Sequence, residues 1–451
     1  MNEELDAIFE EIKTLLADRN YAQLYSRIRI LKPADLALLF EDIPMEDVIL
    51  TFRLLPKDTA ADTFVELEPD RQMHLITAFS DAELKAVLDE LYLDDTVDII
   101  EEMPANVVRR IIRYSSPEMR QSINTILNYP ADSAGSIMTI EFVDLRADMT
   151  VDEAFEHIRT TGWDKETIYT CYVTNSDRRL EGVVTVQQML LCDRSKTIGE
   201  IMDCNVISCK TGDDKVEVAQ TLKKYNFLAL PVVDNENRLV GIVTIDDAID
   251  VLTDEATEDM EIMAAITPIE KTYLRTGIFE TWKQRFPWLL LLMLSSTFTQ
   301  KIISSAEDAL SACVVLTAFI PMLMGTGGNA GGQVSVTVIR GLSLDEIGFS
   351  DWLRVLWKEV RVSLLCGSTL AAANFAKLML FDRVTLEVAA VVSITLLVVV
   401  TIAKVVGCLL PIAAKRIRLD PAVMASPFIT TIVDALALLT YFRVATVFLG
   451  L

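Results

Sequence analysis

The sequence predicts a multidomain protein that joins an all-α superhelical N-terminal domain, an α/β pair of duplicated domains and an α-helical transmembrane domain of five spans. Three observations predict this fold class. Short apolar units of about twelve residues fill the first part of the chain, two later stretches echo each other, and five long apolar segments follow residue 285. We expect domains at 1–131, 132–260 and 285–451, with a connecting helix over 261–284.

Charge is divided unevenly along the chain. Of the 65 acidic and 41 basic residues that give a net charge of −24, only 11 acidic and 15 basic residues lie after residue 273. An acidic soluble part attracts cations, so we expect no nucleic-acid partner. The seven cysteines form no CxxC pair and there are only two histidines, which argues against a disulfide framework, a zinc site or an enzyme. The acidic start of the chain predicts no signal peptide.

The first part of the chain predicts a stack of short helices. Proline opens six of the apolar units, at Pro33, Pro44, Pro56, Pro69, Pro104 and Pro117. Proline is tolerated at the first helical position because its missing N–H has no partner there anyway. Helices this short are unstable alone, so they must pack on one another. Taken by itself, this part is equally consistent with a helical adaptor or spacer.

The stretch from 132 to 260 contains an internal duplication. GSIMTIEFVDLRADMTVDEAFEHI is echoed by GEIMDCNVISCKTGDDKVEVAQTL, and RRLEGVVTV is echoed by NRLVGIVTI. Each copy predicts a short strand, a helix, two strands joined by a polar turn, and a second helix. This pattern resembles a tandem pair of CBS domains, which are regulatory modules that often bind adenine nucleotides.

The CBS resemblance implies a nucleotide signature that ends G-x-x-T-x-x-D. The second copy keeps it as Gly241, Thr244 and Asp247, and Phe227 is a further candidate contact. The first copy has Gln188 where the aspartate belongs. A neutral amide makes weaker hydrogen bonds than a carboxylate, so the sequence alone leaves ATP binding open.

Five apolar segments are long enough to cross a bilayer, near 286–304, 310–339, 353–380, 384–411 and 422–449. The second is interrupted by Pro321 and a run of glycines. Basic residues gather before the first segment, between the second and third, and between the fourth and fifth. The positive-inside rule therefore predicts a multi-pass protein of the cell membrane with a cytoplasmic N-terminal part and an external C-terminus.

Asp434 lies deep in the last apolar segment. A carboxylate in hydrocarbon costs at least ~2.5–3.5 kcal/mol, so it is expected to face a watery path or a partner. One alternative is an ion pair with Lys404 in the fourth segment. The other is a cation pore, because Mg²⁺ keeps its waters and prefers oxygen ligands, and a two-fold axis would double the single carboxylate.

The motif GTGGNAGGQ places Asn329 and Gln333 among glycines at membrane depth. Glycines there indicate either unwound backbone that lines a cavity or close packing of small residues between helices. The two polar side chains are candidates to line a pore.

A third set of candidates is acidic. The run TIDDAIDVLTDEATEDMEIM follows the second repeat, and Asp94, Asp95 and Asp98 lie in the helical stack. Two carboxylates about 5 Å apart repel by roughly 3 kcal/mol at an effective dielectric of 20. A solvated acidic face is one explanation for such a run. Two acidic surfaces in one soluble part favour a divalent cation held between domains.

With these residues in view, the whole chain resembles the MgtE family of Mg²⁺ channels and transporters, most specifically in GTGGNAGGQ, LDPAVMASPFITTIVDAL and DDAIDVLTDEATED. The resemblance implies a homodimer with a pore on its two-fold axis, Mg²⁺ as both transported and regulatory ion, and closure by cytoplasmic Mg²⁺ through a gating helix after Asp259. It also implies metal-binding roles, which fall on Asp62, Asp94, Asp98, Asp246, Asp247, Asp250, Glu255, Glu258, Asp259, Asp420 and Asp434.

Lys404 departs from what a cation path requires, since a lysine that lined the path would oppose Mg²⁺. We therefore expect it to face another helix, a lipid headgroup or an acidic partner. Two other functions stay open from the residues alone. One is transport of another divalent cation such as Co²⁺ or Mn²⁺, and the other is a membrane-anchored CBS sensor without transport.

Overall fold

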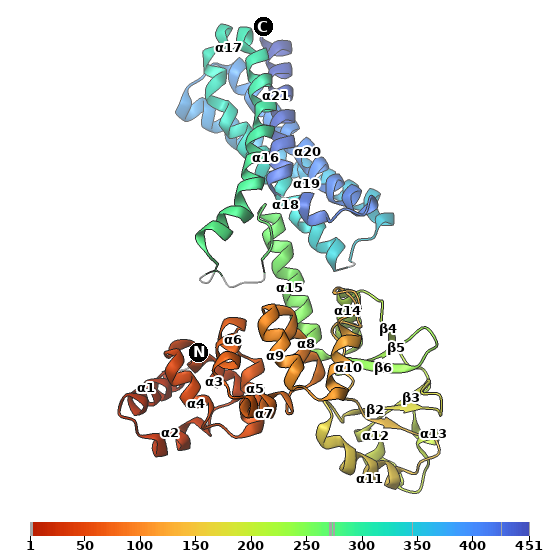
Figure 1. Ribbon diagram of the computed structural model, residues 1–451. Coiled ribbons are helices and arrows are strands. Elements are labelled where there is room, and N and C mark those ends of the chain that lie inside the picture. The colour runs from red at the N-terminus through yellow and green to blue at the C-terminus, as the bar shows by residue number, and fades with distance from the viewer. Residues whose placement is uncertain (1–2, 270–272, 274–275, 345, 425, 451) are drawn as a thin grey trace. The chain divides into compact units, whose positions relative to one another are not determined.

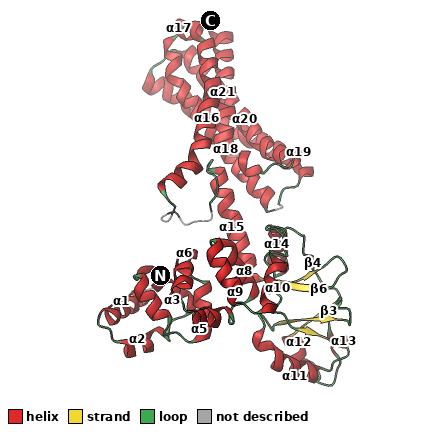
Figure 2. Cartoon of the chain, in the orientation of Figure 1, coloured by secondary structure: helices red, strands yellow, loops and turns green. Residues whose placement is uncertain are grey.

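The structure is a computed structural model that describes residues 3–269, 273, 276–344, 346–424 and 426–450. The chain divides into two compact units, 1–253 and 254–451, and each is described by itself. Helices and two small sheets make up the first unit, and the second unit is helical over its described residues (Figures 1 and 2). The predicted fold class is confirmed.

The first unit begins with a stack of short helices. These are α1 (Glu3–Ala17), α2 (Tyr21–Ile28), α3 (Pro33–Asp42), α4 (Met45–Phe52), α5 (Lys57–Val65), α6 (Pro69–Ala78), α7 (Asp81–Leu88), α8 (Leu93–Glu102), α9 (Ala105–Tyr114) and α10 (Pro117–Ile126). Each of the six prolines is the first helical residue or directly precedes it, as predicted. The helices share one apolar core, in which Phe52 packs against Phe40, Phe64 and Phe79 with ring centroids 5.3–6.5 Å apart.

The duplicated stretch forms two sheets with the same topology. The first contains β1 (Asp144–Leu145), β2 (Thr170–Thr174) and β3 (Leu180–Thr185), with α11 (Val151–Thr161), η1 (Gly162–Asp164), α12 (Val186–Leu191) and α13 (Ile198–Ile201) around it. The second contains β4 (Cys209–Lys210), β5 (Ala229–Val233) and β6 (Leu239–Thr244), with α14 (Lys215–Tyr225) and α15 (Ile245–Met263). In both sheets, the first strand pairs with the second in parallel, and the second pairs with the third antiparallel, with a bulge in the antiparallel pair.

The two copies pack directly against each other. Leu180 N–H donates to the carbonyl of Asn237 over 3.1 Å, and Leu239 N–H donates to the carbonyl of Arg178 over 2.9 Å. Tyr172 and Ile242 are fully buried in a shared apolar cluster. The two copies of the sequence repeat therefore make equivalent contacts with each other.

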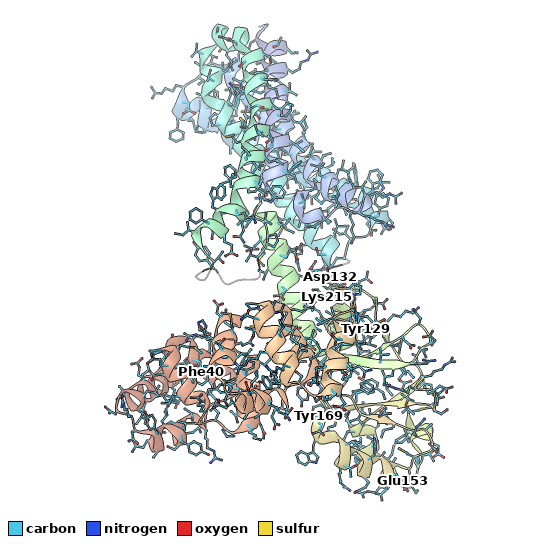
Figure 3. The ribbon with its side chains drawn as sticks, in the orientation of Figure 1. Phe40, Tyr129, Asp132, Glu153, Tyr169 and Lys215 are labelled. Atoms are coloured by element: carbon cyan, nitrogen blue, oxygen red, sulfur yellow. The ribbon has the colours of Figure 1, made fainter. Side chains whose placement is uncertain are left out.

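The helical stack is tied to the second copy through Asp132, which follows it in the chain. Its carboxylate lies 3.1 Å from the Lys215 ammonium, and its carbonyl accepts the Lys215 N–H over 3.1 Å (Figure 3). Stack and repeats thus belong to one compact unit.

The expected single helix over 261–284 is wrong. α15 ends at Met263, and Ala265, two residues later, has a positive φ of 57°, which is incompatible with a continuing right-handed helix. The next helix, α16, begins at Ile278, so the candidate gating segment is divided; part of it, 270–272 and 274–275, lies outside the described residues.

The second unit holds five helical segments long and apolar enough to cross a membrane, which confirms the number of predicted spans. They are α16 (Ile278–Ser305); η2 (Val314–Phe319) with α18 (Ile320–Ser343); η3 (Phe349–Asp351) with α19 (Trp352–Lys377) and η4 (Leu378–Asp382); α20 (Leu386–Arg416); and η5 (Pro421–Met424) with α21 (Ser426–Leu449). A short helix, α17 (Glu307–Ala312), takes up the expected start of the second span. The most buried of the five is α20, which packs against α18, α19 and α21.

The glycine run does not interrupt its span. α18 is continuous from Ile320, and Pro321 lies in its first turn, where proline is tolerated. A Cβ on Gly331 would meet Ile429 of α21 at 2.8 Å, and one on Gly407 of α20 would collide with the Gly331 carbonyl. Of the two alternatives left open by the sequence, the glycines therefore serve close helix packing.

Candidate functional site

A polar cavity of about 230 Å³ lies in the first unit, where the helical stack meets the two repeats. α5 and α8 supply one side of it, the end of β6 and the start of α15 supply another, and the loop after η1 supplies a third. The carboxylates that line it are Asp62, Glu66, Glu90, Asp94, Asp95, Glu166, Asp246 and Asp247. Side chains from both predicted acidic surfaces therefore meet in one place.

Burial and mutual repulsion perturb the acids of this cavity. The Asp94 side chain is buried, and loss of hydration together with the charges of Asp247 and Asp95 raises its pKa well above the ordinary value. The same causes raise the pKa of Asp95 to about 7 and that of Glu166 to about 8. Burial raises the pKa of Asp247 to about 6, although a 2.6 Å hydrogen bond from the Thr244 hydroxyl opposes the rise.

Two further observations describe how the cavity acids are bonded. Asp94 Oδ1 accepts a local hydrogen bond from Asp95 N–H over 3.0 Å. Among the described residues, no basic side chain forms an ion pair with Asp94. Glu166 Oε2 is buried and has no hydrogen-bond partner in the part of the chain that the structure describes. Buried carboxylates without a cation are costly, so the cavity is suited to bind one.

The predicted acidic residues fall into three groups. Asp62, Asp94, Asp246 and Asp247 line the cavity. Asp98 does not line it and its side chain is exposed to solvent, although reduced hydration of the carboxylate and the charge of Asp247 raise its pKa. Asp250, Glu255, Glu258 and Asp259 follow along α15, of which the last three belong to the second unit.

Three cavity acids were not among the predicted residues: Glu66, Glu90 and Glu166. Asp95 was a candidate from its acidic cluster, although the family resemblance implied no metal-binding role for it. Glu166 lies in an irregular loop after η1, where no periodicity or motif marks it. Only the folded chain brings it to the acids of α8 and α15.

Asp259 and Asp420 interact within the second unit. The Ser343 hydroxyl donates to Asp259 over 3.4 Å, while burial and the charge of Asp420 raise the pKa of Asp259. Asp420 accepts the Ala422 N–H over 2.8 Å and so caps η5. Two of the predicted metal positions are thus close enough to repel each other.

Asp434 lies in the middle of α21, in a span of the second unit. Its Oδ1 is buried without a hydrogen-bond partner among the described residues. The predicted alternative of a pair with Lys404 is not what the structure forms, because the Lys404 ammonium lies 3.8 Å from Glu359 of α19 and both side chains are nearly buried. The expectation of an acidic partner for Lys404 is confirmed.

Asn329 and Gln333 lie one turn apart on the exposed side of α18. Gly331, which lies between them, faces the other way, toward α20 and α21. The polar pair is therefore free of the helix packing inside one chain.

The nucleotide signature has a local role in both repeats. The Thr244 hydroxyl binds Asp247, and in the first repeat Gln188 Oε1 accepts the Thr185 N–H over 2.8 Å in a capping box. Gln188 thus replaces the aspartate as a helix-capping partner. Phe227 is partly buried against the core of the second repeat and stacks on Tyr225 at 5.5 Å.

Mg²⁺ fits the donor set of the cavity, although not as a fully dehydrated ion. Within the described ranges, no three histidine, cysteine, aspartate or glutamate side chains are arranged to hold one metal directly. Mg²⁺ keeps several of its waters and uses one or two carboxylates, so a cavity lined by carboxylates and roomy enough for water suits a hydrated ion.

Fold and site together define a class: multi-pass membrane proteins in which an acidic unit with a duplicated α/β module precedes a domain of five membrane spans. Three family models match along the chain, namely the MgtE intracellular N domain over residues 31–132, the CBS domain over 134–192 and 198–254, and the divalent cation transporter MgtE over 320–444. The chain belongs to the MgtE family, whose members are transporters and not enzymes.

Relatives support this over nearly the whole length. The magnesium transporter MgtE of Thermus thermophilus is 35% identical over 92% of this chain and 93% of its own, and that of Bacillus subtilis is 32% identical over 98% of both. Among solved structures, the cytosolic domain of the Mg²⁺ channel MgtE in complex with ATP matches at 34% identity and a TM-score of 0.52, covering 54% of this chain and 99% of its own. The soluble part of a magnesium transporter matches at 30% identity and 0.53.

Proposed function

We propose that this chain forms a homodimeric Mg²⁺ channel for magnesium uptake, with the pore on the two-fold axis and Asp434 facing it. The observation that carries the proposal is the Asp434 carboxylate, which lies mid-span with a buried oxygen that no described residue satisfies. A carboxylate in that position needs a cation or water. Asn329 and Gln333 would line the same path from the exposed side of α18.

The ion is Mg²⁺ because the candidate ligands are all oxygen atoms. Hard oxygen ligands suit Mg²⁺, whereas thiolate and imidazole favour softer metals, and transport of Mn²⁺ or Co²⁺ is the alternative. Inward flow needs no ATP hydrolysis, because a membrane potential of 100 mV supplies about 4.6 kcal/mol for a divalent ion. In this arrangement the C-terminus is external.

Regulation arises in the acidic cavity. At low cytoplasmic Mg²⁺ its carboxylates repel one another and loosen the first unit, and at high Mg²⁺ they share bound ions and hold it compact. The compact state then holds the divided segment 261–284 so that the pore closes. Several ions are needed, because moving a gate from 1:99 to 99:1 takes about 5.5 kcal/mol. One ion at ten times its dissociation constant supplies only about 1.4 kcal/mol.

ATP is a second candidate ligand, at the second repeat only, where Thr244, Asp247 and Phe227 remain. The structure of a relative at 34% identity contains ATP in its cytosolic domain. Gln188 keeps the capping bonds but not the charge in the first repeat. Calorimetric titration with ATP, comparing the wild-type chain with Asp247→Asn, tests this site.

The test of transport is Mg²⁺ flux into liposomes that carry the purified protein, with Asp434→Asn beside wild type. Glu387→Gln, at an exposed carboxylate where α20 begins, is the matched control. We expect flux in the wild type and control, no flux in Asp434→Asn, and a decrease at high Mg²⁺ on the sensor side. Flux of Mn²⁺ or Co²⁺ but not Mg²⁺ would change the assigned ion. Absence of flux for all three ions would favour the alternative function, a membrane-anchored CBS sensor that does not transport ions.

A further inference from the structure

One exposed face of α19 carries three cations and a tryptophan. Arg354, Trp357, Lys358 and Arg361 recur at helical spacings of three and four residues, so they share one stripe. All four are exposed; the Arg354 side chain is 89% exposed and Trp357 is 62% exposed. None of them takes part in the cavity or in the candidate pore.

The stripe has internal order. The Arg361 guanidinium lies over the Trp357 ring, 5.7 Å from its centroid, and its Nε donates to the Trp357 carbonyl over 3.4 Å. Arg354 lies 3.4 Å from Asp351, which is the acidic contact the structure gives for this stripe. Three cations against one carboxylate leave the face positive.

The other face of α19 packs against the rest of the protein. Glu359 meets Lys404, Ser363 is buried, and a Cβ on Gly367 would meet Leu397 at 2.7 Å. The charged stripe is therefore on the side of the helix that α20 does not cover.

The stripe continues into the bilayer. Leu364 and Leu365 follow it along the same face and are 52% and 70% exposed, as expected for side chains in contact with lipid tails. The change along this face of α19, from basic side chains to leucines, marks the boundary of the hydrocarbon layer. From Arg354 to Arg361 the helix rises about 10 Å, which is enough to cross one headgroup layer of about 5–8 Å.

The stripe lies on the intracellular side. The N domain is intracellular and precedes the first span, so the connection between α18 and α19 is on the same side as that domain. The cytoplasmic leaflet is the one whose anionic lipids attract basic segments next to a span, and tryptophan is enriched at that depth.

We propose that this face of α19 binds the phosphate of an anionic phospholipid, with Arg354, Lys358 and Arg361 around the headgroup and Trp357 at the boundary with the acyl chains. Arginine and lysine supply several donors to a phosphate, and guanidinium binds it in bidentate fashion. The site anchors the intracellular end of α19, and through Glu359 on its opposite face it steadies the buried contact with α20.

The experiment uses the full chain in nanodiscs of phosphatidylcholine with added phosphatidylglycerol, and native mass spectrometry counts the phosphatidylglycerol retained after transfer to detergent. We expect the wild type to retain it preferentially. Arg354→Gln, Lys358→Gln and Arg361→Gln together should lower the affinity about five-fold for each cation removed. Arg354→Lys with Arg361→Lys, which keeps the charge, should retain most of it.

Arg383→Gln is the matched control, because Arg383 is an exposed cation at the opposite end of α19. Equal retention by the triple glutamine variant and wild type would overturn the proposal, and the stripe would then be free to bind an acidic protein surface. An equal loss in the Arg383→Gln control would overturn it as well, because the effect would be one of net charge. Displacement of the lipid by inorganic phosphate would show that the phosphate alone, not a lipid, is bound.

Discussion

Lys404 of α20 and Glu359 of α19 form an ion pair inside the membrane unit. The Lys404 Nζ lies 3.8 Å from Glu359 Oε2, and the two side chains are only 8% and 15% exposed. The pair explains how a lysine can occupy a span near the candidate cation path. Its charge is neutralised within the protein, on the α19 side of α20, rather than directed at the ion.

Removal of one member of this pair is expected to destabilise the membrane unit strongly. Lys404→Met leaves the Glu359 carboxylate buried alone, and breaking a buried pair in this way typically costs about 3–5 kcal/mol. Thermal unfolding in detergent measures the loss. Lys404→Met combined with Glu359→Met should recover much of it, because no unpaired charge is left. Additive losses in the double variant would mean that the two residues do not interact.

A methyl group at Gly407 is expected to separate α18 from α20. The added Cβ would collide with the carbonyl of Gly331, which is backbone and cannot rotate away. Overpacking of this kind costs about 1–3 kcal/mol, so Gly407→Ala should lower the unfolding temperature and the Mg²⁺ flux together. Gly325→Ala is the control for the unfolding temperature, because no atom lies within 4 Å of the added carbon. If both variants behave alike, close packing at Gly407 is not what the position requires.

In the absence of divalent cations, the first unit is expected to lose stability as the pH rises. Burial and repulsion raise the folded-state pKa of Asp95 to about 7 and that of Glu166 to about 8, above their unfolded values near 4. The folded unit therefore binds more protons than the unfolded chain, and stability falls as the pH rises from about 4 to about 8. Limited proteolysis of the full chain with EDTA, at pH 5.5 and pH 8, should show faster cleavage of this unit at pH 8.

The same experiment has an internal control. Added Mg²⁺ should slow the cleavage at pH 8 far more than at pH 5.5, because protons occupy the carboxylates at the lower pH. Cleavage that is independent of pH in EDTA would contradict the raised pKa values.

Glu166 is expected to contribute to Mg²⁺ sensing although no motif marks it. Glu166→Gln removes a charge from the cavity, so protection by Mg²⁺ should need several-fold more of the ion, while the unit without Mg²⁺ should become more stable at pH 8. Glu181→Gln is a suitable control, because it lies on an exposed strand position of the same repeat and does not line the cavity. An unchanged Mg²⁺ dependence in Glu166→Gln would remove this residue from the sensor.

Local sequence patterns predicted much of the fold. The prolines at helix starts, the two β-rich repeats and the five apolar segments each depend on chemistry within a few residues, such as a missing N–H or the length needed to span a bilayer. The helix expected over 261–284 was wrong for a related reason. Its apolar and charged residues allow a helix, but the positive φ of Ala265 follows from the folded path of the chain and not from residue type.

The sequence by itself determined the class of this protein: an acidic soluble part, a duplicated regulatory module, five spans and a single carboxylate in the last of them. Only the tertiary structure decided which charges meet. It brought Glu166 to Asp94, paired Lys404 with Glu359 and turned the glycine run into a packing surface. The physical reason is that charge and packing energies depend on distances between segments far apart in the chain. A residue's type and its neighbours in sequence do not specify those distances.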